Sequence, residues 1–182
     1  MRGFKHIESR DQIFNGKYLK LEKLKINLPD GRRGEREVVR VEDAAAVIPV
    51  DKNGKVQLVR QYRHAIEKDI LEVPAGLINK GETPEQTAVR ECEEETGFRP
   101  QRLKRLLYYA HAEGYSSGFT TLFLGLDLIY TGKINPDSTE LLERVSLPFE
   151  QLLKKVKQGE ILDSKTILCV LLYERMRYDI ET

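Results

Sequence analysis

The sequence predicts an α/β fold in which helices pack on a mixed sheet, with an antiparallel β-hairpin at the N-terminus. The length of 182 residues suits one α/β domain with a small extension. Alternating apolar and polar residues, typical of strands, fill the first third of the chain, and apolar residues at helical spacing follow. We therefore expect a β-hairpin region at residues 1–42 and the main domain at residues 43–182.

The first third of the chain reads as strands and turns. The strands are expected at residues 18–28, 37–41, 44–50, 56–63 and 70–73. The first two form a hairpin around the turn PDGRRG, with a bulge near Glu22 and Lys23, where the alternation slips once. The next two are core strands that form a second hairpin around DKNG. The short last strand leads into the turn Pro74-Ala75-Gly76.

A helix is expected from Pro84 to Gly97. Thr83 is a good N-cap, proline suits the first helical position, and Gln86 completes a T-x-x-Q capping box. Gly97 is a natural residue to end the helix.

The last part of the chain adds two strands and two helices. Strands at 103–109 and 121–130 flank the loop HAEGYSSGF, and a short helix at 148–157 follows. Asp163 or Ser164 caps a final helix. Its expected buried residues are Ile167, Leu168, Leu171, Leu172 and Met176.

Three carboxylates on the first helix are the main chemical signal. Glu91, Glu94 and Glu95 stand at i, i+3 and i+4, so they share one face and repel each other. A divalent cation relieves this repulsion, and oxygen-only ligands favour Mg2+ or Mn2+ over zinc. The alternative is a solvated acidic face, the usual fate of a Glu-rich helix.

The run GLINKGETPEQTAVRECEEETGF, residues 76–98, fits the spacing G-x5-E-x7-R-E-φ-x-E-E-x-G-φ, where φ is apolar. The matching residues are Gly76, Glu82, Arg90, Glu91, Cys92, Glu94, Glu95, Gly97 and Phe98. This run is identified as a Nudix box, and the chain resembles a Nudix hydrolase. The resemblance implies a Nudix α/β/α sandwich.

Further segments resemble the ADP-ribose pyrophosphatase subgroup. RQYRHAI, LEVPAG and GEILDSKTILCVLL extend the resemblance over residues 36–176. It implies Mg2+-dependent hydrolysis, with Mn2+ as a substitute, of a nucleoside diphosphate sugar, first of all ADP-ribose to AMP and ribose 5-phosphate. It also implies a homodimer built through residues 1–42.

The resemblance also assigns roles to residues. The metal ligands are the Ala75 carbonyl, Glu91, Glu94 and Glu95, and Glu82 braces Arg90, which orients the box. The general base is Glu94 or Glu140, with Asp137 and Glu143 near the latter, and His64 and His111 are further acid–base candidates. The diphosphate is bound by Arg63, with Arg60 and Arg36 as further candidates, because arginine binds phosphate through two parallel hydrogen bonds.

Two loops depart from the subgroup. A PGxSSE-like loop is replaced by EGYSSG, with Glu113 and Gly118 in place of the proline and the glutamate, and an HPGAV-like stretch by VEDAAAV. Both are expected near the base or sugar, where Tyr115 or Phe119 is a stacking candidate. Alternative functions are hydrolysis of another nucleoside diphosphate derivative, a non-catalytic nucleotide sensor, or a prenyl diphosphate isomerase, for which Cys92 is poorly placed.

Composition argues against other classes. Thirty Lys and Arg residues balance twenty-nine Asp and Glu residues, so the net charge of +1 gives no large footprint for nucleic acid. Cys92 and Cys169 fall within helices and are expected as small core residues. No signal peptide or membrane-length apolar segment is visible, and a soluble cytoplasmic protein is expected.

Overall fold

The computed structural model describes residues 6–135 and 141–180, and it divides the chain into two compact units. The first unit comprises Met1–Asp43 and Tyr109–Thr120, and the second comprises Ala44–Tyr108 and Thr121–Thr182. Across the described part of the chain, none of the helices has both the length and the apolar character needed to cross a membrane.

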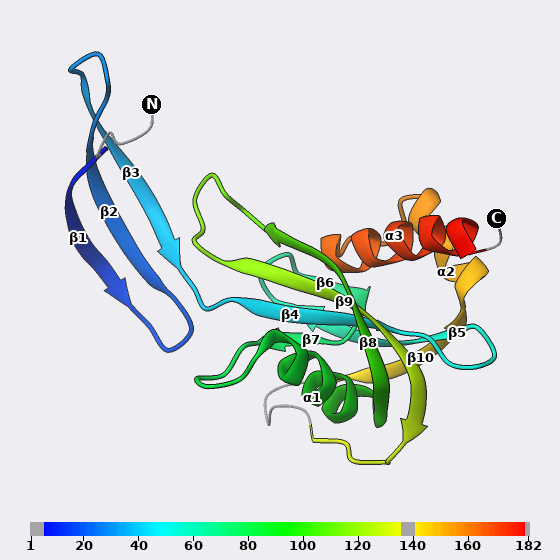
Figure 1. The fold of residues 1–182 in the computed structure, drawn as a ribbon. Helices are drawn as coiled ribbons and strands as arrows, with labels where there is room; N and C mark the ends of the chain where they lie inside the picture. Colours follow the sequence, from blue (N-terminus) through cyan, green and yellow to red (C-terminus); the bar gives the residue numbers. More distant parts are fainter. Residues whose placement is uncertain (1–5, 136–140, 181–182) are drawn as a thin grey trace. The chain divides into compact units, whose positions relative to one another are not determined.

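The first unit contains a three-stranded sheet (Figure 1). Its strands, in spatial order, are β1 (Ile7–Asn15), β2 (Lys20–Asn27) and β3 (Arg33–Arg40). The expected hairpin is confirmed as β2 and β3, whereas β1 was not predicted. The prediction of a bulge in β2 is wrong, because the pairing register between β2 and β3 is unbroken. The register shifts occur instead in the pairing of β1 with β2. One extra residue of β1 stands opposite Glu22, close to where the alternation slips.

The second unit is built on two further sheets. Their strands are β4 (Ala44–Pro49), β5 (Lys55–Arg63), β6 (Lys68–Glu72), β7 (Ala75–Leu77), β8 (Phe98–Ala110), β9 (Phe119–Tyr130) and β10 (Glu143–Pro148). One sheet has the order β10-β5-β6 and the other β7-β4-β9-β8. β7 lies where a turn was expected, and β10 is a strand that was not predicted.

The expected hairpin between residues 44–50 and 56–63 is wrong. β4 and β5 lie in different sheets, and the bridge between Val50 and Val56 marks the point from which they diverge. Both edges of each strand are used elsewhere, since β4 pairs with β7 and β9 while β5 pairs with β6 and β10.

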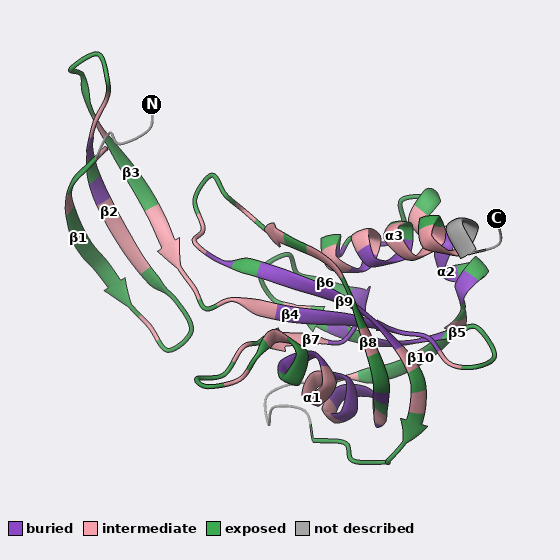
Figure 2. Ribbon diagram, in the orientation of Figure 1, coloured by how far each residue is buried: buried purple, intermediate pink, exposed green. Residues whose placement is uncertain are grey.

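Helices cover both sides of the β4 sheet, as expected for a Nudix-like sandwich (Figure 1). They are α1 (Pro84–Thr96), α2 (Phe149–Lys157) and α3 (Ser164–Ile180), with α1 on one side and the other two opposite. Ala45 and Val47 of β4 pack with Ala88 and Cys92 of α1. Successive strand residues face opposite sides, and Ala46 is also fully buried, so both faces of β4 are core (Figure 2).

The ends of α1 are as predicted. Thr83 accepts a hydrogen bond from the Gln86 backbone N–H, and the Gln86 side chain accepts one from the Thr83 N–H. Gly97 ends the helix with a φ of 80°, a left-handed conformation that favours glycine. These caps fix where each carboxylate of the helix lies along the neighbouring strands.

The last helix is correctly placed, but its expected buried face is wrong. Thr166, Cys169 and Val170 are fully buried, whereas Leu171 is 41% exposed. Asp163 caps the helix by accepting a hydrogen bond from the Thr166 N–H. The Thr166 hydroxyl accepts one from the Val73 N–H, and this contact turns the polar first turn inward.

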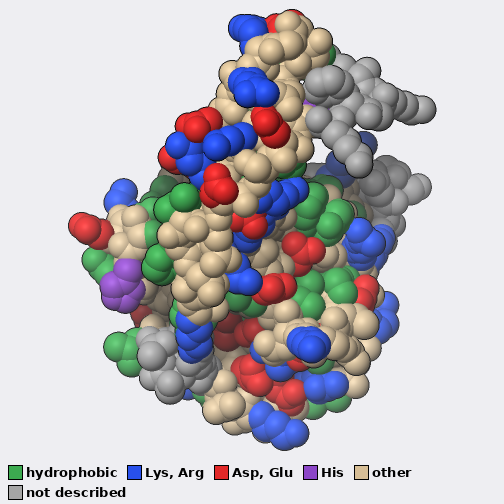
Figure 3. Space-filling model, turned by 90° about the vertical axis from the view of Figure 1, so that its left-hand side faces the viewer, with side chains coloured by type: hydrophobic (Ala, Val, Ile, Leu, Met, Phe, Trp, Pro, Cys, Tyr) green, Lys and Arg blue, Asp and Glu red, His purple; other side chains and the backbone are tan. Residues whose placement is uncertain are grey.

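Acidic and basic side chains are interspersed over the face shown in Figure 3. Exposed ion pairs of the protein include Lys23–Glu35 and Arg32–Asp30. Surface pairs of this kind contribute about 0–1 kcal/mol each, so they do little to hold the fold.

Candidate active site

Arg90 makes most of the described hydrogen bonds on the polar side of α1. Its Nε and Nη2 donate to the two carboxylate oxygens of Glu82 at 2.8 and 3.0 Å. Its Nη1 donates to Glu91 at 2.6 Å and to Glu94 at 3.1 Å. Nη2 also donates to the Leu77 carbonyl. The guanidinium therefore ties the loop before α1 to two carboxylates of the helix.

Glu82 fixes this arrangement from the loop. Besides Arg90, it accepts hydrogen bonds from the Thr87 hydroxyl at 2.9 Å and the Asn79 N–H at 3.2 Å. The bond from Arg90, assisted by those from Thr87 and Asn79, outweighs burial and lowers the pKa of Glu82 to about 2. These bonds give Glu82 the bracing position that the sequence predicts.

The ionised form of Glu82 should stabilise the fold in a defined pH range. Its pKa falls from an ordinary 4.5 to about 2, so its contribution is complete above pH 4.5 and is lost as the pH drops toward 2. We expect Glu82→Gln to lower Tm at pH 7 and the gap to the wild type to narrow between pH 5 and pH 2. Circular dichroism melts across this range measure the gap.

A matched control for this prediction is Glu85→Gln, because Glu85 lies nearby in the first turn of α1 but bonds to neither Arg90 nor Thr87 among the described contacts. Its Tm gap should not narrow in the same way. A Glu82→Gln gap that is equally wide at pH 7 and pH 2 would contradict the role of the charge.

Glu91 lies directly against the backbone of the preceding loop. A Cβ placed on Gly76 would overlap the Glu91 carboxylate, so only glycine leaves room for it. Gly76 belongs to β7, which pairs with β4 through Ala44, Ala45 and Ala46. The sheet therefore holds the Ala75–Gly76 backbone beside the Glu91 carboxylate.

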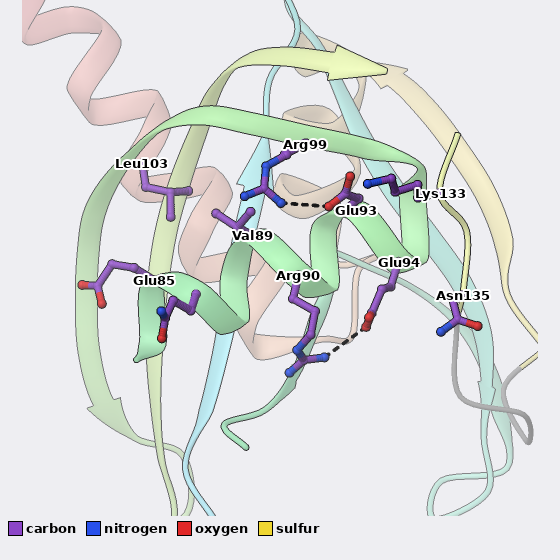
Figure 4. Close-up of a pocket in the computed structure, with 10 residues that line it drawn as sticks. Glu85, Val89, Arg90, Glu93, Glu94, Arg99, Leu103, Lys133 and Asn135 are labelled. Atoms are coloured by element: carbon purple, nitrogen blue, oxygen red, sulfur yellow. Dashed lines mark hydrogen bonds and ion pairs between the residues drawn. The ribbon is translucent and has the colours of Figure 1, made fainter. Parts of the chain in front are cut away.

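The box glutamates Glu94 and Glu95 have different surroundings. Glu95 is only 4% exposed, whereas Glu94 is partly exposed and points with Arg90 toward a hollow outside the helix (Figure 4). The hollow has a volume of about 490 Å3 and is also lined by Val89, Leu103 and an Arg99–Glu93 ion pair. Glu94 thus bonds to Arg90 and also lines the hollow.

Arg63 meets a buried carboxylate on the neighbouring strand. Its Nε and Nη2 donate to Glu72 at 2.6 and 2.8 Å, and Glu72 is 1% exposed. The bond to Glu72 raises the pKa of Arg63 despite partial burial, and the charges of Asp163 and Glu95 add to the shift. Arg63 therefore lies within electrostatic reach of the box glutamate Glu95.

The remaining expected residues have other described partners or fall outside the described part of the chain. Arg60 forms an exposed ion pair with Glu143 at 3.2 Å, across the β5–β10 pair. Arg36 is an exposed residue of the first unit and donates to the neighbouring Glu35 carbonyl. Glu140 and Asp137 lie outside the described residues.

Comparison with known proteins identifies the family. The NUDIX domain model matches residues 40–167, the greater part of the chain. The chain belongs to the Nudix family. It is 36% identical over 163 residues to the "ADP-ribose pyrophosphatase" of Bacillus subtilis, covering 89% of this chain and 88% of the relative. It is 37% identical over 163 residues to the "Methanol dehydrogenase activator" of Bacillus methanolicus, covering 88% of this chain and 87% of the relative.

The fold agrees with this assignment. A crystal structure of an ADP compounds hydrolase superposes with a TM-score of 0.82 at 22% identity, covering 97% of this chain and 96% of that one. The Nudix sandwich expected from the sequence is thereby confirmed. With the family match and the related pyrophosphatases, the chain is a Nudix pyrophosphohydrolase.

Nudix hydrolases generally use divalent metal ions, and the donors around Gly76 fit one. Carboxylate and carbonyl oxygens are the ligands that hard cations prefer. The close approach of Glu91 to Gly76 sets a carboxylate beside the main chain of β7. Among the described residues, no three His, Cys, Asp or Glu side chains form a ready-made cluster, and Arg90 bridges Glu91 and Glu94.

None of the described hydrogen bonds of the two cysteines, His64 or His111 reaches Glu91, Glu94 or Glu95. Cys92 is fully buried, and burial raises the pKa of its thiol to about 12, so it is an inert core residue. This burial disfavours the isomerase alternative. Cys169 is equally buried. His111 lies 3.2 Å from the Ser116 hydroxyl in the first unit, and His64 makes an edge contact with Tyr62.

Sequence reasoning missed the residues behind Arg63. Glu72 also accepts a bond from Lys165, which bonds in turn to Asp163. Burial would lower the pKa of Lys165, but the charges of Asp163 and Glu72 outweigh it and raise the pKa. The sequence does hold one signal for these residues. Glu72 stands between Leu71 and Val73 in a strand expected to be buried, and a buried carboxylate needs charged or hydrogen-bonding partners.

Proposed function

We propose that this Nudix hydrolase splits the diphosphate bond of a nucleoside diphosphate sugar, and that ADP-ribose, converted to AMP and ribose 5-phosphate, is its substrate. The observation that carries the substrate class is the B. subtilis relative named "ADP-ribose pyrophosphatase", 36% identical over 89% of this chain. The complete Nudix box supports catalysis, because none of its glutamates is lost.

In this proposal, the box residues hold Mg2+, with Mn2+ as a substitute. The ligands are the Ala75 carbonyl, Glu91, Glu94 and Glu95. A bound cation lowers the pKa of water and neutralises charge on the bridging oxygen. Arg90, bonded to both Glu91 and Glu94, keeps their carboxylates in place between turnovers.

The protein side chains then bind the substrate and move the proton. Arg63 binds the diphosphate, since its described bonds run from Nε and Nη2 to Glu72 and leave Nη1 for a second anion. A water oxygen forms a bond to one phosphorus in line, and the bond from that phosphorus to the bridging oxygen breaks. Glu94 or Glu140 accepts the water proton. Arg60 and Arg36 are secondary candidates for substrate contact.

A panel assay tests the substrate class. ADP-ribose, GDP-mannose, a dinucleoside polyphosphate and NADH are each incubated with the protein and Mg2+, then Mn2+, and products are separated by chromatography. We expect AMP and ribose 5-phosphate from ADP-ribose at the highest kcat/KM. Faster turnover of another compound would reassign the substrate within the family.

A regulatory function is the second candidate. It is favoured by the 37% identical relative named "Methanol dehydrogenase activator". A nucleotide sensor would bind one member of the panel tightly and turn over none. The intact box glutamates favour the hydrolase over this alternative.

We also propose a homodimer formed through the N-terminal sheet of residues 6–42. Three-stranded sheets need a covered face for independent stability. On the first unit, large apolar side chains are exposed, among them Ile13 (59%), Phe14 (54%) and Tyr18 (57%). Light scattering that gives the mass of a single chain would reject the dimer.

A further inference from the structure

Four charged side chains behind the candidate diphosphate site form one chain of bonds. Arg63 holds both oxygens of Glu72, Lys165 Nζ donates to Glu72 at 3.2 Å, and the same Nζ donates to Asp163 at 2.5 Å. Glu72 and Asp163 are 1% and 8% exposed. The four residues come from β5, β6 and the start of α3, so the arrangement joins three elements of the second unit.

The position of Lys165 is unfavourable for its own helix. It lies in the first turn of α3, where the helix dipole repels a cation. Its ammonium group is also largely removed from water, at a cost that its partners must offset. Helix stability therefore does not explain a lysine here, and its contacts with the two carboxylates do.

The signs of the charges alternate along the chain. Asp163 is negative, Lys165 positive, Glu72 negative and Arg63 positive, so the sum is zero and a cation stands at the outer end. Loss of the Lys165 charge would leave the four residues with a net charge of −1, and loss of the Asp163 charge would leave them with a net charge of +1. A diphosphate is an anion. By Coulomb's law, loss of the Lys165 charge therefore weakens the attraction between these residues and a diphosphate, and loss of the Asp163 charge strengthens it.

We propose that Lys165 and Asp163 are positioning residues that set, through Glu72, how strongly Arg63 attracts a diphosphate. The proposal rests on the proposed function, in which Arg63 binds the diphosphate. Lys165 compensates the charge of Glu72, so the Arg63 cation remains available to a second anion. Asp163 limits that effect while it caps α3 through its other oxygen.

The test is binding of α,β-methylene-ADP, a non-hydrolysable diphosphate, measured by calorimetry with Lys165→Met and Asp163→Asn. We expect the Kd to rise about tenfold for Lys165→Met, within the range of couplings inside one ion-pair network. For Asp163→Asn we expect it to fall about twofold, because asparagine is an equally good N-cap. A purely structural role would weaken binding in both variants, so equal weakening would overturn the proposal.

Two further variants guard against misfolding. Lys165→Arg keeps the charge and should restore most of the affinity. Lys157→Met removes another lysine that ties α3, through Glu174 at 2.7 Å, and should leave the Kd unchanged. If Lys165→Met does not fold, Lys165→Gln replaces it, and an unchanged Kd in the folded variant overturns the proposal.

Kinetics separate this proposal from the proposed function. With ADP-ribose, Lys165→Met should raise KM with kcat within about twofold, the pattern of a lost binding interaction. Opposite Kd shifts in a protein that hydrolyses no nucleotide sugar would reject the function and leave the inference standing. If the wild type hydrolyses ADP-ribose but the Kd is unchanged in Lys165→Met and Asp163→Asn, only the inference is rejected. The inference alone is also rejected if the wild type does not bind α,β-methylene-ADP.

Discussion

The double substitution Glu94→Gln, Glu95→Gln is expected to lower kcat for ADP-ribose by at least about a thousandfold, since loss of one transition-state contact already costs about 10² to 10³. Glutamine keeps the size of each side chain but removes the charge that a divalent cation needs. Glu95 is 4% exposed, so its replacement changes the charge of the protein interior and not of the surface. Initial rates with saturating Mg2+ and Mn2+ measure the effect.

The control for this experiment is again Glu85→Gln, on the exposed part of the same helix. It should retain kcat within about twofold, because surface substitutions away from special features have small effects. Melting curves of all variants show whether the fold is kept. Near-normal turnover by a folded double variant would remove Glu94 and Glu95 from the metal assignment.

Gly76→Ala should separate stability from activity. The added Cβ meets the end of the flexible Glu91 side chain, which can move aside, so we expect a loss of unfolding free energy of about 1 kcal/mol, the lower end of overpacking costs. The displaced carboxylate no longer lies beside the Ala75–Gly76 backbone. We therefore expect kcat to fall by about 10- to 100-fold, the usual effect of disturbing a metal ligand's support.

Gly114→Ala is the matched control, because a Cβ there meets nothing within 4 Å. It should leave Tm unchanged, and Glu85→Gln serves as the control for kcat. Chemical denaturation and initial rates on the same preparations give both quantities for each variant. If Gly76→Ala keeps full activity, the position of Glu91 against the backbone has no catalytic importance.

The sequence predicted the elements whose local signals are strong. The capping box at Thr83 and the glycine end at Gly97 define α1 within the chain itself, and both are observed. The bracing of Arg90 by Glu82 was likewise expected from the box spacing. In each case the deciding contacts lie within a few residues of each other along the chain.

Features that depend on distant partners were missed. β1 carries charged and exposed residues, so its strand character comes from pairing with β2 and not from its own pattern. β4 and β5 look like a hairpin locally, but pairing with other strands separates them into two sheets. The face that α3 buries depends on the contact of Thr166 with Val73, which helix periodicity does not contain.

The candidate site shows the same division. The positions of Glu91 and Arg90 were expected. The partner of Arg63 was not, because an arginine at the end of β5 gives no sign that a buried glutamate, Glu72, lies at the end of β6. The Glu140 assignment stays a prediction. The link from Glu72 to Lys165 spans 93 residues, and no local pattern foretells it.

The bond between Thr166 and the Val73 N–H has a consequence for how the protein matures during synthesis. The two residues are 93 positions apart, yet Val73 stands two residues before the Ala75 carbonyl. Translation proceeds at about 5–20 residues per second, so the strand waits about 5–20 s on the ribosome for its partner. The nascent chain therefore completes this corner of the fold only after the start of α3 has been synthesised.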